Sequence, residues 1–512
     1  MGPQPFTMPH IEYSALAPVF VLFVAATLGV LIEAFVGRTL RRQLQLLVTF
    51  GSLIIALAFA ITQWSSHAVV AEGALALDGP AVLLQITLLV IAIVGALLMA
   101  ETKADPAGDA FAPRTSAIPG SDDEREFTMR GWTQTEIWPL FLFAVSGSIL
   151  FPMANDLLTM FIALEMLSLP LYLLVGMSRR RRLLSQEAAL KYFVLGAFAS
   201  ALFLFGAALI YAASGELTLG AIANAANQDS STTSLMLIGA VLVLVGLFFK
   251  VGAAPFHQWS PDVYQGAPTA ITAYMSAATK IAAFGAVMRL LYVGLQGLQW
   301  DWQPVVATVA VISMLVGSSA ALVQTNIKRV LAYSSVAHAG FIMTAMLAVN
   351  PRGLAGALTY LVTYGFVSTA AFAVVSLVRS PAGEANDISQ WAGLGRKSPV
   401  TAAVFTFLLL ALAGLPLTSG FTAKFVALSS AWNGWTGGVV IAAVLTSAVA
   451  AFFYLRIIVS MYFSPAKDDI SVTVPSTLTR LAIGVCVGIT TVFGFAPQAV
   501  LALVEHAGVF VS

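Results

Sequence analysis

Residues 241–284 read VLVLVGLFFKVGAAPFHQWSPDVYQGAPTAITAYMSAATKIAAF, and this stretch decides how the rest of the chain is interpreted. Two long apolar runs meet here across a joint that contains glycine and proline. Each run carries one lysine, Lys250 or Lys280, where lipid or a protein interior is expected. A lysine at the centre of a membrane helix costs about 2.5–3.5 kcal/mol on the insertion scale. These charges therefore need partners, or they have a function that requires burial.

The composition of the chain is that of an integral membrane protein. Of its 512 residues, 59% are hydrophobic and 10% are charged, whereas soluble domains carry about 25% charged residues. The net charge of +1 gives no indication of a nucleic-acid partner. The single cysteine, Cys486, excludes a disulfide or a multi-cysteine iron–sulfur or zinc site within these residues, and we expect it to be buried. No basic residue precedes the first apolar run, so no signal peptide is predicted.

The apolar runs predict an all-α polytopic membrane protein with about fourteen transmembrane helices, because about 20 apolar residues span a bilayer as a helix. The predicted spans begin near Ser14, Gln43, Pro80, Thr135, Asp156, Glu187, Ser234, Pro268, Gln303, Val330, Leu354, Val400, Gly437 and Thr477. The longest polar stretch, residues 101–132, has the composition of a flexible cytoplasmic loop, and we assign it no chemistry.

Basic residues gather in alternate loops between these spans. They are Arg38, Arg41 and Arg42 after the first span, Lys103, Arg114, Arg125 and Arg130 after the third, Arg179, Arg180, Arg181 and Arg182 after the fifth, Lys328 and Arg329 after the ninth, Arg379, Arg396 and Lys397 after the eleventh, and Lys467 after the thirteenth. By the positive-inside rule these loops are cytoplasmic and both termini lie on the outer side, with Arg352 as the main exception. The run from Arg179 to Arg182 is interpreted as a topology anchor, with contact to anionic lipid as the alternative.

Two of the spans are interrupted in opposite sense. The seventh ends FFKVGAAPFHQW, with Lys250 five residues before Pro255. The twelfth reads LLLALAGLPLTSGFTAKF, with Lys424 eight residues after Pro416. Interrupted segments in corresponding positions of two halves indicate a transporter built of inverted repeats, with its site near the middle of the membrane. The alternative is that glycine and proline are simply common in membrane helices.

Five ionisable side chains fall within or at the edge of apolar spans: Glu165, Lys191, Lys250, Lys280 and Lys424. Such residues face the interior of a bundle and pair with one another. Helix-to-helix adhesion would account for one ion pair but not for four lysines against one glutamate. A desolvated lysine releases its proton readily, and a neighbouring carboxylate opposes that release. The set therefore predicts proton transfer controlled by Glu165, and the absence of clustered ligands predicts no metal site.

Three further side chains are candidate relays between the lysines: His257, Tyr333 and His338. The alternative for each is a packing role. Glu187 precedes Lys191 by four residues, which is a helical ion-pair spacing, and is either a local partner or part of an entry path. The chain has no nucleotide-binding loop and no nucleophile elbow, so we expect no redox or covalent active site in it.

The stretch FFKVGAAPFHQWSPDVYQGAPTAITAYMSAATK resembles the signature of the antiporter-like membrane subunits of respiratory complex I, the NADH-quinone oxidoreductase, and its PDVYQGAP form resembles subunit N. The segments EAALKYFVLGAFASALFLFGAALIY, NIKRVLAYSSVAHAGF and GLPLTSGFTAKF are also N-like. The related L and M subunits and the large Mrp antiporter subunits tend toward an HVEAP-like ending instead. The resemblance covers the chain from about Glu136 to about Phe463.

This resemblance implies two inverted five-helix repeats, spans 4–8 and 9–13, with spans 7 and 12 broken. The corresponding regions are residues 1–133 (three spans and a loop), 134–297 (first repeat), 298–464 (second repeat) and 465–512 (last span). It also implies that Glu165 and Lys250 form a regulating pair, that Lys280 is the central proton carrier and that Lys424 faces the exit half-channel. Lys191, His257 and Tyr333 match further polar positions of the family.

The resemblance further implies a proton-translocating subunit of a bacterial plasma-membrane enzyme, driven by quinone reduction elsewhere in the complex. NADH, FMN, the iron–sulfur clusters and quinone would belong to partner subunits, and the chain would contact neighbouring antiporter-like and small membrane subunits and the lipid bilayer. Two alternatives remain: an Mrp-type sodium/proton antiporter subunit, and a structural spacer whose charges only hold helices together.

Overall fold

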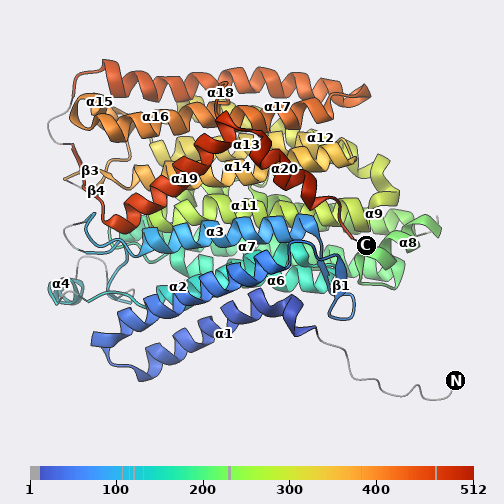
Figure 1. The fold of residues 1–512 in the computed structure, drawn as a ribbon, viewed down its shortest axis with the longest axis horizontal. Helices are drawn as coiled ribbons and strands as arrows, with labels where there is room; N and C mark the ends of the chain where they lie inside the picture. The colour runs from blue at the N-terminus through green and yellow to red at the C-terminus, as the bar shows by residue number, and fades with distance from the viewer. Residues whose placement is uncertain are drawn as a thin grey trace.

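The computed structural model describes residues 12–105, 108–114, 116–118, 121–130, 132–228, 232–381, 383–466 and 470–511. Long helices run side by side to form one elongated bundle (Figure 1). Within the described residues, eleven helices are long and apolar enough to cross a membrane, and two shorter apolar helices accompany them. The chain is therefore a polytopic all-α membrane protein, as predicted. Lys467 and part of the loop 101–132 lie outside the described residues.

The N-terminal half contains most of its residues in the helices of the bundle. They are α1 (Tyr13–Phe35), α2 (Arg38–Thr62), α3 (Gly79–Met99), α5 (Ile137–Leu150) continued by η1 (Phe151–Met153), α6 (Leu157–Val175), α7 (Arg182–Ser214), α9 (Thr233–Val251), α10 (Trp259–Gly266) and α11 (Thr269–Arg289). Two shorter helices, α4 (Asp122–Met129) and α8 (Leu219–Gln228), lie in connections.

The C-terminal half continues in the same way. Its helices are η2 (Leu290–Gly294), η3 (Gln296–Leu298), α12 (Gln299–Val323), α13 (Ile327–Met346), α14 (Pro351–Val375), η4 (Ile388–Trp391), α15 (Leu394–Lys397), α16 (Pro399–Ala413), α17 (Ser419–Ala431), η5 (Gly434–Thr436), α18 (Gly437–Phe463), α19 (Thr477–Phe495) and α20 (Gln498–Ala507). Two small antiparallel sheets lie in connections: β1 (Ala68–Val70) with β2 (Leu75–Leu77), and β3 (Val378–Ser380) between β4 (Gly383–Glu384) and β5 (Ser471–Val472).

Helices begin close to the predicted span starts. The largest offset is five residues, where α2 begins at Arg38 rather than Gln43 and α7 begins at Arg182 rather than Glu187. In both cases the helix continues beyond the apolar run into turns that carry arginine, which a hydropathy criterion does not include. Short polar side chains fix other starts. Asp78 accepts a hydrogen bond from Ala81 N at 3.0 Å, and Asp156 accepts one from Thr159 N at 2.8 Å.

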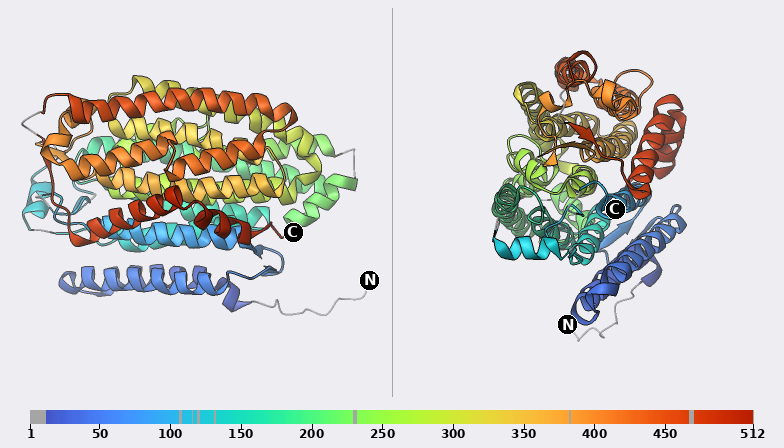
Figure 2. Two further views of the ribbon diagram at one scale, coloured as in Figure 1. Left: turned by 45° about the horizontal axis from the view of Figure 1, so that its top comes forward. Right: turned by 90° about the vertical axis from the view of Figure 1, so that its left-hand side faces the viewer.

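The centre of the bundle is formed by α11 and α14, whose side chains are almost entirely buried. Seen from the end, α1 and α2 extend from one edge as a pair (Figure 2), and their outer faces expose apolar residues such as Phe35 and Leu47. A helix that is apolar on all sides is typical of a membrane span. The interior is therefore protein, and the exposed apolar faces fit lipid or another membrane chain.

Glycines bring neighbouring helices into close contact. A Cβ on Gly206 of α7 would lie 2.5 Å from the carbonyl oxygen of Gly239 in α9, and one on Gly239 would lie 2.7 Å from that of Gly206. A Cβ on Gly317 of α12 would lie 2.5 Å from the backbone nitrogen of Ala337 in α13. Small residues let backbones approach in this way where lipid supplies no hydrophobic driving force between helices.

The two predicted interruptions are present. One separates α9 from α10 and the other separates α16 from α17. Gly252 and Gly414 end the first helix of each pair with φ of +71° and +82°, a left-handed conformation that favours glycine. Each interruption leaves the last carbonyls of a helix without intrahelical partners inside the bundle, and this determines the chemistry described below.

The loops that carry Arg180, Arg379 and Arg396 meet at one end of the bundle, near α4, β3 and α15, which we call the basic end (Figure 1). The start of α1 and the end of α20 lie at the opposite end (Figure 1). Basic loops that are far apart in sequence thus share one end, as their alternation along the chain predicts.

The prediction of a flexible loop at residues 101–132 is wrong where its first part is described. Asp105 and Asp109 are buried, and they pair with Arg180 and Arg179 at 2.6 Å each. Burial raises the pKa of the Asp109 carboxyl even though the Arg179 guanidinium opposes that shift. The composition of the segment indicated a solvated loop. It contains no information about the arginines of a distant loop that pair with these carboxylates.

Candidate functional site

Three of the predicted lysines lie inside the bundle. Lys250 on α9 and Lys280 on α11 are each 2% exposed, and Lys424 on α17 is 6% exposed. None of the three forms an ion pair with a carboxylate among the residues that the structure describes. Each ammonium group instead donates hydrogen bonds to neutral oxygens, and these partners differ from site to site.

Lys250 lies in the last turn of α9, where its Nζ donates to Ser168 Oγ at 2.7 Å and to Tyr192 OH at 3.1 Å. The rings of Tyr172 and Tyr192 lie 5.7 and 5.2 Å from the same nitrogen. Cation–π attraction at this range adds to the hydrogen bonds. The charge is therefore held by a hydroxyl and aromatic environment and not by an anion in direct contact.

Glu165 lies on α6, one turn before Ser168, so the two side chains share a face of the helix. Its carboxylate accepts a hydrogen bond from Ser200 Oγ of α7. It is half-buried and lies close enough to Lys250 for electrostatic attraction, although the two groups make no direct contact. Ser168 donates to the Leu164 carbonyl and accepts from Lys250, whereas the partner of Glu165 is Ser200, so the predicted pair is not joined by a direct hydrogen bond.

Lys280 lies in the middle of α11, and its Nζ donates to the backbone carbonyl of Val251. That carbonyl belongs to the last residue of α9, at the first helix interruption. The C-terminal end of a helix carries a partial negative charge, which attracts a cation. A Cβ on Gly252 would lie 3.9 Å from the Lys280 nitrogen, so the interruption itself forms one wall of the lysine site.

Lys424 has the same arrangement at the second interruption. Its Nζ donates to the carbonyl of Ala413, the last residue of α16, at 2.8 Å and to Ser447 Oγ of α18 at 2.9 Å. The Phe341 ring lies 4.8 Å from the nitrogen. A Cβ on Gly414 would lie 2.7 Å from Lys424 Cδ, so the absence of a side chain there lets the lysine reach the helix end. On its other side Lys424 borders a mostly apolar groove of about 500 Å³.

His338 of α13 lies between two tyrosines. Its Nδ1 is 2.8 Å from Tyr360 OH of α14 and its Nε2 is 3.3 Å from Tyr454 OH of α18. Tyr454 is also hydrogen-bonded to Ser334, one turn before the histidine. A cavity of about 10 Å³ separates this cluster from Leu412 and Gly420 at the second interruption, which is space for about one water molecule. His338 thus lies in a polar cluster inside the apolar core.

Among the described residues, the remaining predicted residues make no hydrogen bond to the three buried lysines. The rings of His257 and Tyr333 are 6.0 Å apart, and His257 Nδ1 is buried without a hydrogen-bond partner among the described residues. Lys191 is 44% exposed and forms ion pairs with Glu187 at 2.7 Å and Asp262 at 2.8 Å. The structure therefore brings Lys191 into a surface ion cluster and not into the buried series.

Sequence inspection missed a fully buried ion pair. Arg289 Nη2 at the end of α11 lies 2.8 Å from Asp78 Oδ1, and both side chains are 0% exposed. Arg289 also donates to the Pro152 carbonyl at 2.9 Å, and Asp78 accepts from Val511 N at 2.9 Å. Both residues flank predicted spans, and Asp78 has the sequence context of a helix cap, but no local signal indicates that they meet across 211 residues.

The partners of the predicted residues were also missed. They are Ser168, Tyr192, Ser200, Tyr360, Ser447 and Tyr454. Hydroxyl-bearing residues are common in membrane helices and carry no signal of their own, so only the packing identifies these six. Among the described residues no group of three or more His, Cys, Asp or Glu side chains could hold a metal ion, and Cys486 is buried.

Residues 154–450 match the model of the family described as NADH:quinone oxidoreductase/Mrp antiporter, TM. The chain is 51% identical over 529 aligned residues to NADH-quinone oxidoreductase subunit N 3 of Streptomyces griseus, covering 99% of this chain and 96% of the relative. It is also 51% identical to subunit N of Rhodococcus opacus, covering 98% and 97% of the two chains.

Two solved structures contain chains with a similar fold. A chain of respiratory complex I from Thermus thermophilus aligns with a TM-score of 0.77 and 33% identity, covering 97% of this chain and all of that one. A chain of the Mrp complex from a Dietzia species aligns with a TM-score of 0.79 but only 21% identity, covering 97% of each chain. The second likeness establishes the fold alone. The chain belongs to the subunit N family of NADH-quinone oxidoreductases.

Proposed function

We propose that this chain is a proton-translocating membrane subunit of an NADH:quinone oxidoreductase, and that Lys250, Lys280 and Lys424 carry the protons. One observation supports the proposal most strongly: each of these buried ammonium groups is held by neutral oxygens. A lysine whose partners are neutral can lose its proton without leaving a buried carboxylate unpaired. The same site therefore tolerates both protonation states, as a proton carrier requires.

In this proposal Glu165 controls the first carrier. A carboxylate near Lys250 favours the ammonium form, and weakening that interaction favours proton release. Ser168 and Ser200 are the hydroxyl groups through which such a change would act, since they contact Lys250 and Glu165 respectively. Lys280 then receives the proton at the first interruption and Lys424 passes it toward the exit at the second.

Polar side chains provide the remaining steps. His338 lies between Tyr360 and Tyr454, which suits a relay between the two halves of the bundle. We assign His257 and Tyr333 to the hydrated side of the first interruption. Lys191, with its two carboxylate partners, is assigned to the entry surface and not to the buried series.

We infer fourteen spans in total, with residues 134–297 and 298–464 as inverted repeats and residues 1–133 and 465–512 as flanking regions. The matched geometry of the two interruptions supports this division, because in both cases a lysine contacts the last carbonyl before a left-handed glycine. When the basic end is placed in the cytoplasm, both termini of the chain lie on the outer side of a bacterial plasma membrane.

The relatives are subunits of a redox enzyme, so we place the oxidation chemistry in partner chains. NADH, FMN, the iron–sulfur clusters and quinone would be bound there, and quinone reduction would drive proton movement in this chain. The partners would be neighbouring antiporter-like and small membrane subunits of the same complex, alongside the lipid bilayer. No nucleic-acid partner is proposed.

The test is proton pumping by the intact complex in membrane vesicles that carry Lys280→Ala or Glu165→Ala. We expect NADH-driven pumping to fall by at least about tenfold for Lys280→Ala and by less for Glu165→Ala, because only the first removes a carrier. Arg396→Gln, an exposed change at the basic end, is the control. Normal pumping by correctly assembled Lys280→Ala complex would refute the proposal.

The matched family model covers Mrp antiporters together with NADH:quinone oxidoreductases, which leaves a second candidate, a sodium/proton antiporter subunit. Affinity purification of the chain from its native membrane distinguishes the two. Recovery with redox subunits supports the first function, and recovery with antiporter subunits only supports the second. A purely structural spacer would instead show lost assembly, with unchanged pumping per assembled complex, in the same lysine variants.

A further inference from the structure

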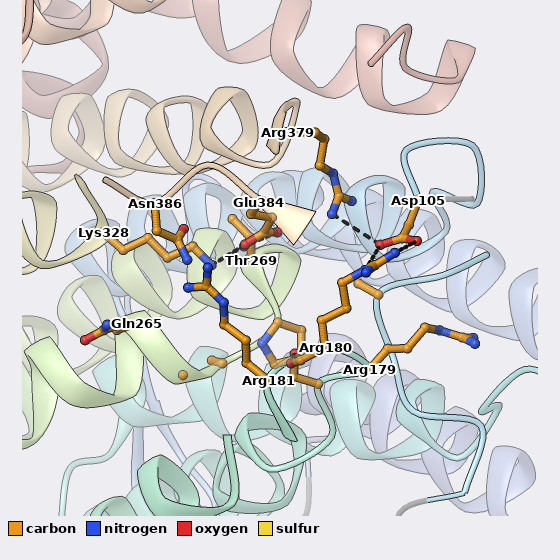
Figure 3. Close-up of a pocket in the computed structure, with 15 residues that line it drawn as sticks. Asp105, Arg179, Arg180, Arg181, Gln265, Thr269, Lys328, Arg379, Glu384 and Asn386 are labelled. Atoms are coloured by element: carbon orange, nitrogen blue, oxygen red, sulfur yellow. Dashed lines mark hydrogen bonds and ion pairs between the residues drawn. The ribbon is translucent and has the colours of Figure 1, made fainter. Parts of the chain in front are cut away.

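A pocket at the basic end of the bundle has no part in the proton route proposed above. It is formed where the loop between α6 and α7 meets the turn between α10 and α11, the start of α13 and the hairpin of β3 and β4 (Figure 3). Its volume is about 50 Å³. One water molecule needs about 10–15 Å³ of such space, so the pocket has room for a group of a few non-hydrogen atoms.

Cations outnumber anions in the lining of this pocket. The cationic side chains are Arg179, Arg180, Arg181, Lys328 and Arg379, and the anionic ones are Asp105 and Glu384. One further carboxylate, that of Asp109 behind the lining, pairs with Arg179. Even with that pair included, five positive charges face three negative ones, and the walls exclude part of the solvent that would otherwise screen them.

The carboxylates are already engaged. Asp105 accepts hydrogen bonds from Arg180 at 2.6 and 2.8 Å and lies 3.3 Å from Arg379 Nη1 (Figure 3). Glu384 lies 2.5 Å from Lys328 Nζ and accepts from Thr269 Oγ1 at 2.6 Å. Burial alone would raise the pKa of Glu384, but Lys328 lowers it overall, so this carboxylate stays ionised and committed to the lysine. Neither acid is free to balance another cation.

Three polar groups in the pocket have no partner among the described residues. Arg379 Nε and Asn386 Oδ1 are buried without a hydrogen bond. Asn386 is only 3% exposed, so bulk solvent does not supply the missing partner. Because amide oxygen and nitrogen positions can be exchanged, Asn386 can present an N–H to the pocket. The guanidinium of Arg181 makes no hydrogen bond or ion pair with any described residue, yet it extends toward Lys328 (Figure 3).

The backbone of Arg181 is also held in an unfavourable conformation. Its φ is +54° and ψ is +44°, the left-handed region that costs a residue with a Cβ about 1–2 kcal/mol. This conformation directs an arginine into the pocket beside another cation. Two positive groups that face each other repel unless an anion lies between them.

We propose that this pocket binds a phosphate group, with Arg181, Arg379 and Asn386 as its direct ligands. A tetrahedral oxyanion matches the volume, the excess of positive charge and the unused N–H donors, and arginine forms strong charge-assisted hydrogen bonds to phosphate oxygens. The group comes either from an anionic phospholipid headgroup or from inorganic phosphate. Bound there, it connects the loop before α7 to β3 and to the segment that follows β4.

The experiment uses the intact complex, purified in detergent and depleted of loosely bound lipid. Two probes are applied: radiolabelled inorganic phosphate in equilibrium dialysis, and phosphatidylglycerol against phosphatidylcholine in nanodiscs, with lipid retained after detergent washing counted by mass spectrometry. The variants are Arg181→Gln, Arg181→Gly and Arg181→Lys. Arg181→Gly removes the side chain and relieves the backbone strain, so it separates loss of the ligand from loss of folding. Arg396→Gln at the same end is the matched control.

We expect the wild-type complex, Arg181→Lys and Arg396→Gln to bind one more equivalent of phosphate, or to retain one more phosphatidylglycerol, than Arg181→Gln and Arg181→Gly. If binding is still measurable in the last two, it should be about tenfold weaker. Saturable binding of phosphate alone identifies the free anion, and selective retention of phosphatidylglycerol identifies the lipid. Equal binding by the wild type and both side-chain-removing variants, or equal loss in Arg396→Gln, would overturn the proposal.

Discussion

Two kinds of buried cation occur in this protein, and their partners differ. Arg289 is fully buried against the carboxylate of Asp78, and a backbone carbonyl fixes its other face. Lys280 and Lys424 are almost as buried, but they contact the carbonyl ends of interrupted helices. Loss of the positive charge would leave a buried carboxylate without a counterion, whereas it would leave a carbonyl partner neutral. The comparison teaches that burial alone does not separate a structural cation from a candidate proton carrier: the residue type and the partner do, because a guanidinium stays protonated in proteins and a lysine need not.

The largest effect on stability is expected from removing the carboxylate of the buried ion pair between Asp78 and Arg289. Asp78→Asn should leave the Arg289 charge without a counterion and reduce the stability of the chain by about 3–5 kcal/mol. Thermal unfolding of the detergent-purified complex, together with its yield in native gels, measures this. A stability equal to that of wild type would remove the basis of the comparison.

Replacing a lysine that contacts a backbone carbonyl should change stability little and reduce proton pumping strongly. In Lys424→Met the desolvated charge disappears, which offsets the lost hydrogen bonds, so we expect stability to change by no more than about 1 kcal/mol. Proton pumping should nevertheless fall by about tenfold or more. Pumping in vesicles and thermal unfolding are measured on the same preparation, and a large loss of stability with normal pumping per assembled complex would reverse the assignment.

A smaller effect is expected from the helix end that receives Lys424. Gly414→Ala places a methyl group where only 2.7 Å separates it from Lys424 Cδ, and its φ of +82° disfavours any residue with a Cβ. We expect a loss of about 1–2 kcal/mol in stability and a partial decrease in pumping, because the lysine must move from the Ala413 carbonyl. Gly438→Ala on α18, where no atom lies within 4 Å of the new Cβ, is the control.

The smallest effect concerns a carboxylate outside the membrane spans. Glu101 accepts hydrogen bonds from Ser476 N at 2.8 Å and Thr479 Oγ1 at 2.6 Å, and so joins the end of α3 to the start of α19. Burial would raise the pKa of Glu101, but these hydrogen bonds lower it below the ordinary value of 4.5. The stabilisation is therefore present above pH 4.5 and is lost as pH falls through the lowered pKa.

Glu101→Gln should accordingly cost about 1 kcal/mol at pH 7, and the difference from wild type should vanish as the medium becomes more acidic than pH 4.5. Unfolding of the purified complex at several pH values measures this. A difference that is constant across the whole pH range would show that the carboxylate charge does not contribute.

The fold by itself does not separate this chain from an antiporter subunit. The TM-scores to the complex I chain and to the Mrp chain are 0.77 and 0.79, whereas the identities are 33% and 21%. The same overall fold thus occurs in both complexes, and the sequence identity carries the distinction that the backbone does not. This agrees with the general finding that function resides in sites placed on shared folds.

Much of the architecture could be predicted from sequence because its causes are local. Runs of apolar residues indicated the membrane spans, and glycine with proline indicated both interruptions. The errors came from contacts between distant segments. Lys191 was grouped with the buried lysines, but Asp262 of another helix draws it into an exposed ion cluster. The loop 101–132 was expected to be flexible, but in its described part Arg179 and Arg180 pair with the buried carboxylates of Asp109 and Asp105.

The sequence alone determined that this protein lies in a membrane, that lysines occupy its helices and that two helices are broken beside them. Only the tertiary structure decided which oxygen each lysine meets: the Val251 carbonyl for Lys280 across 29 residues, and Asp78 for Arg289 across 211. The physical reason is that hydropathy and backbone propensity act over a few turns of one helix. The state of a buried charge depends instead on whichever group the packing of other helices places within hydrogen-bond distance.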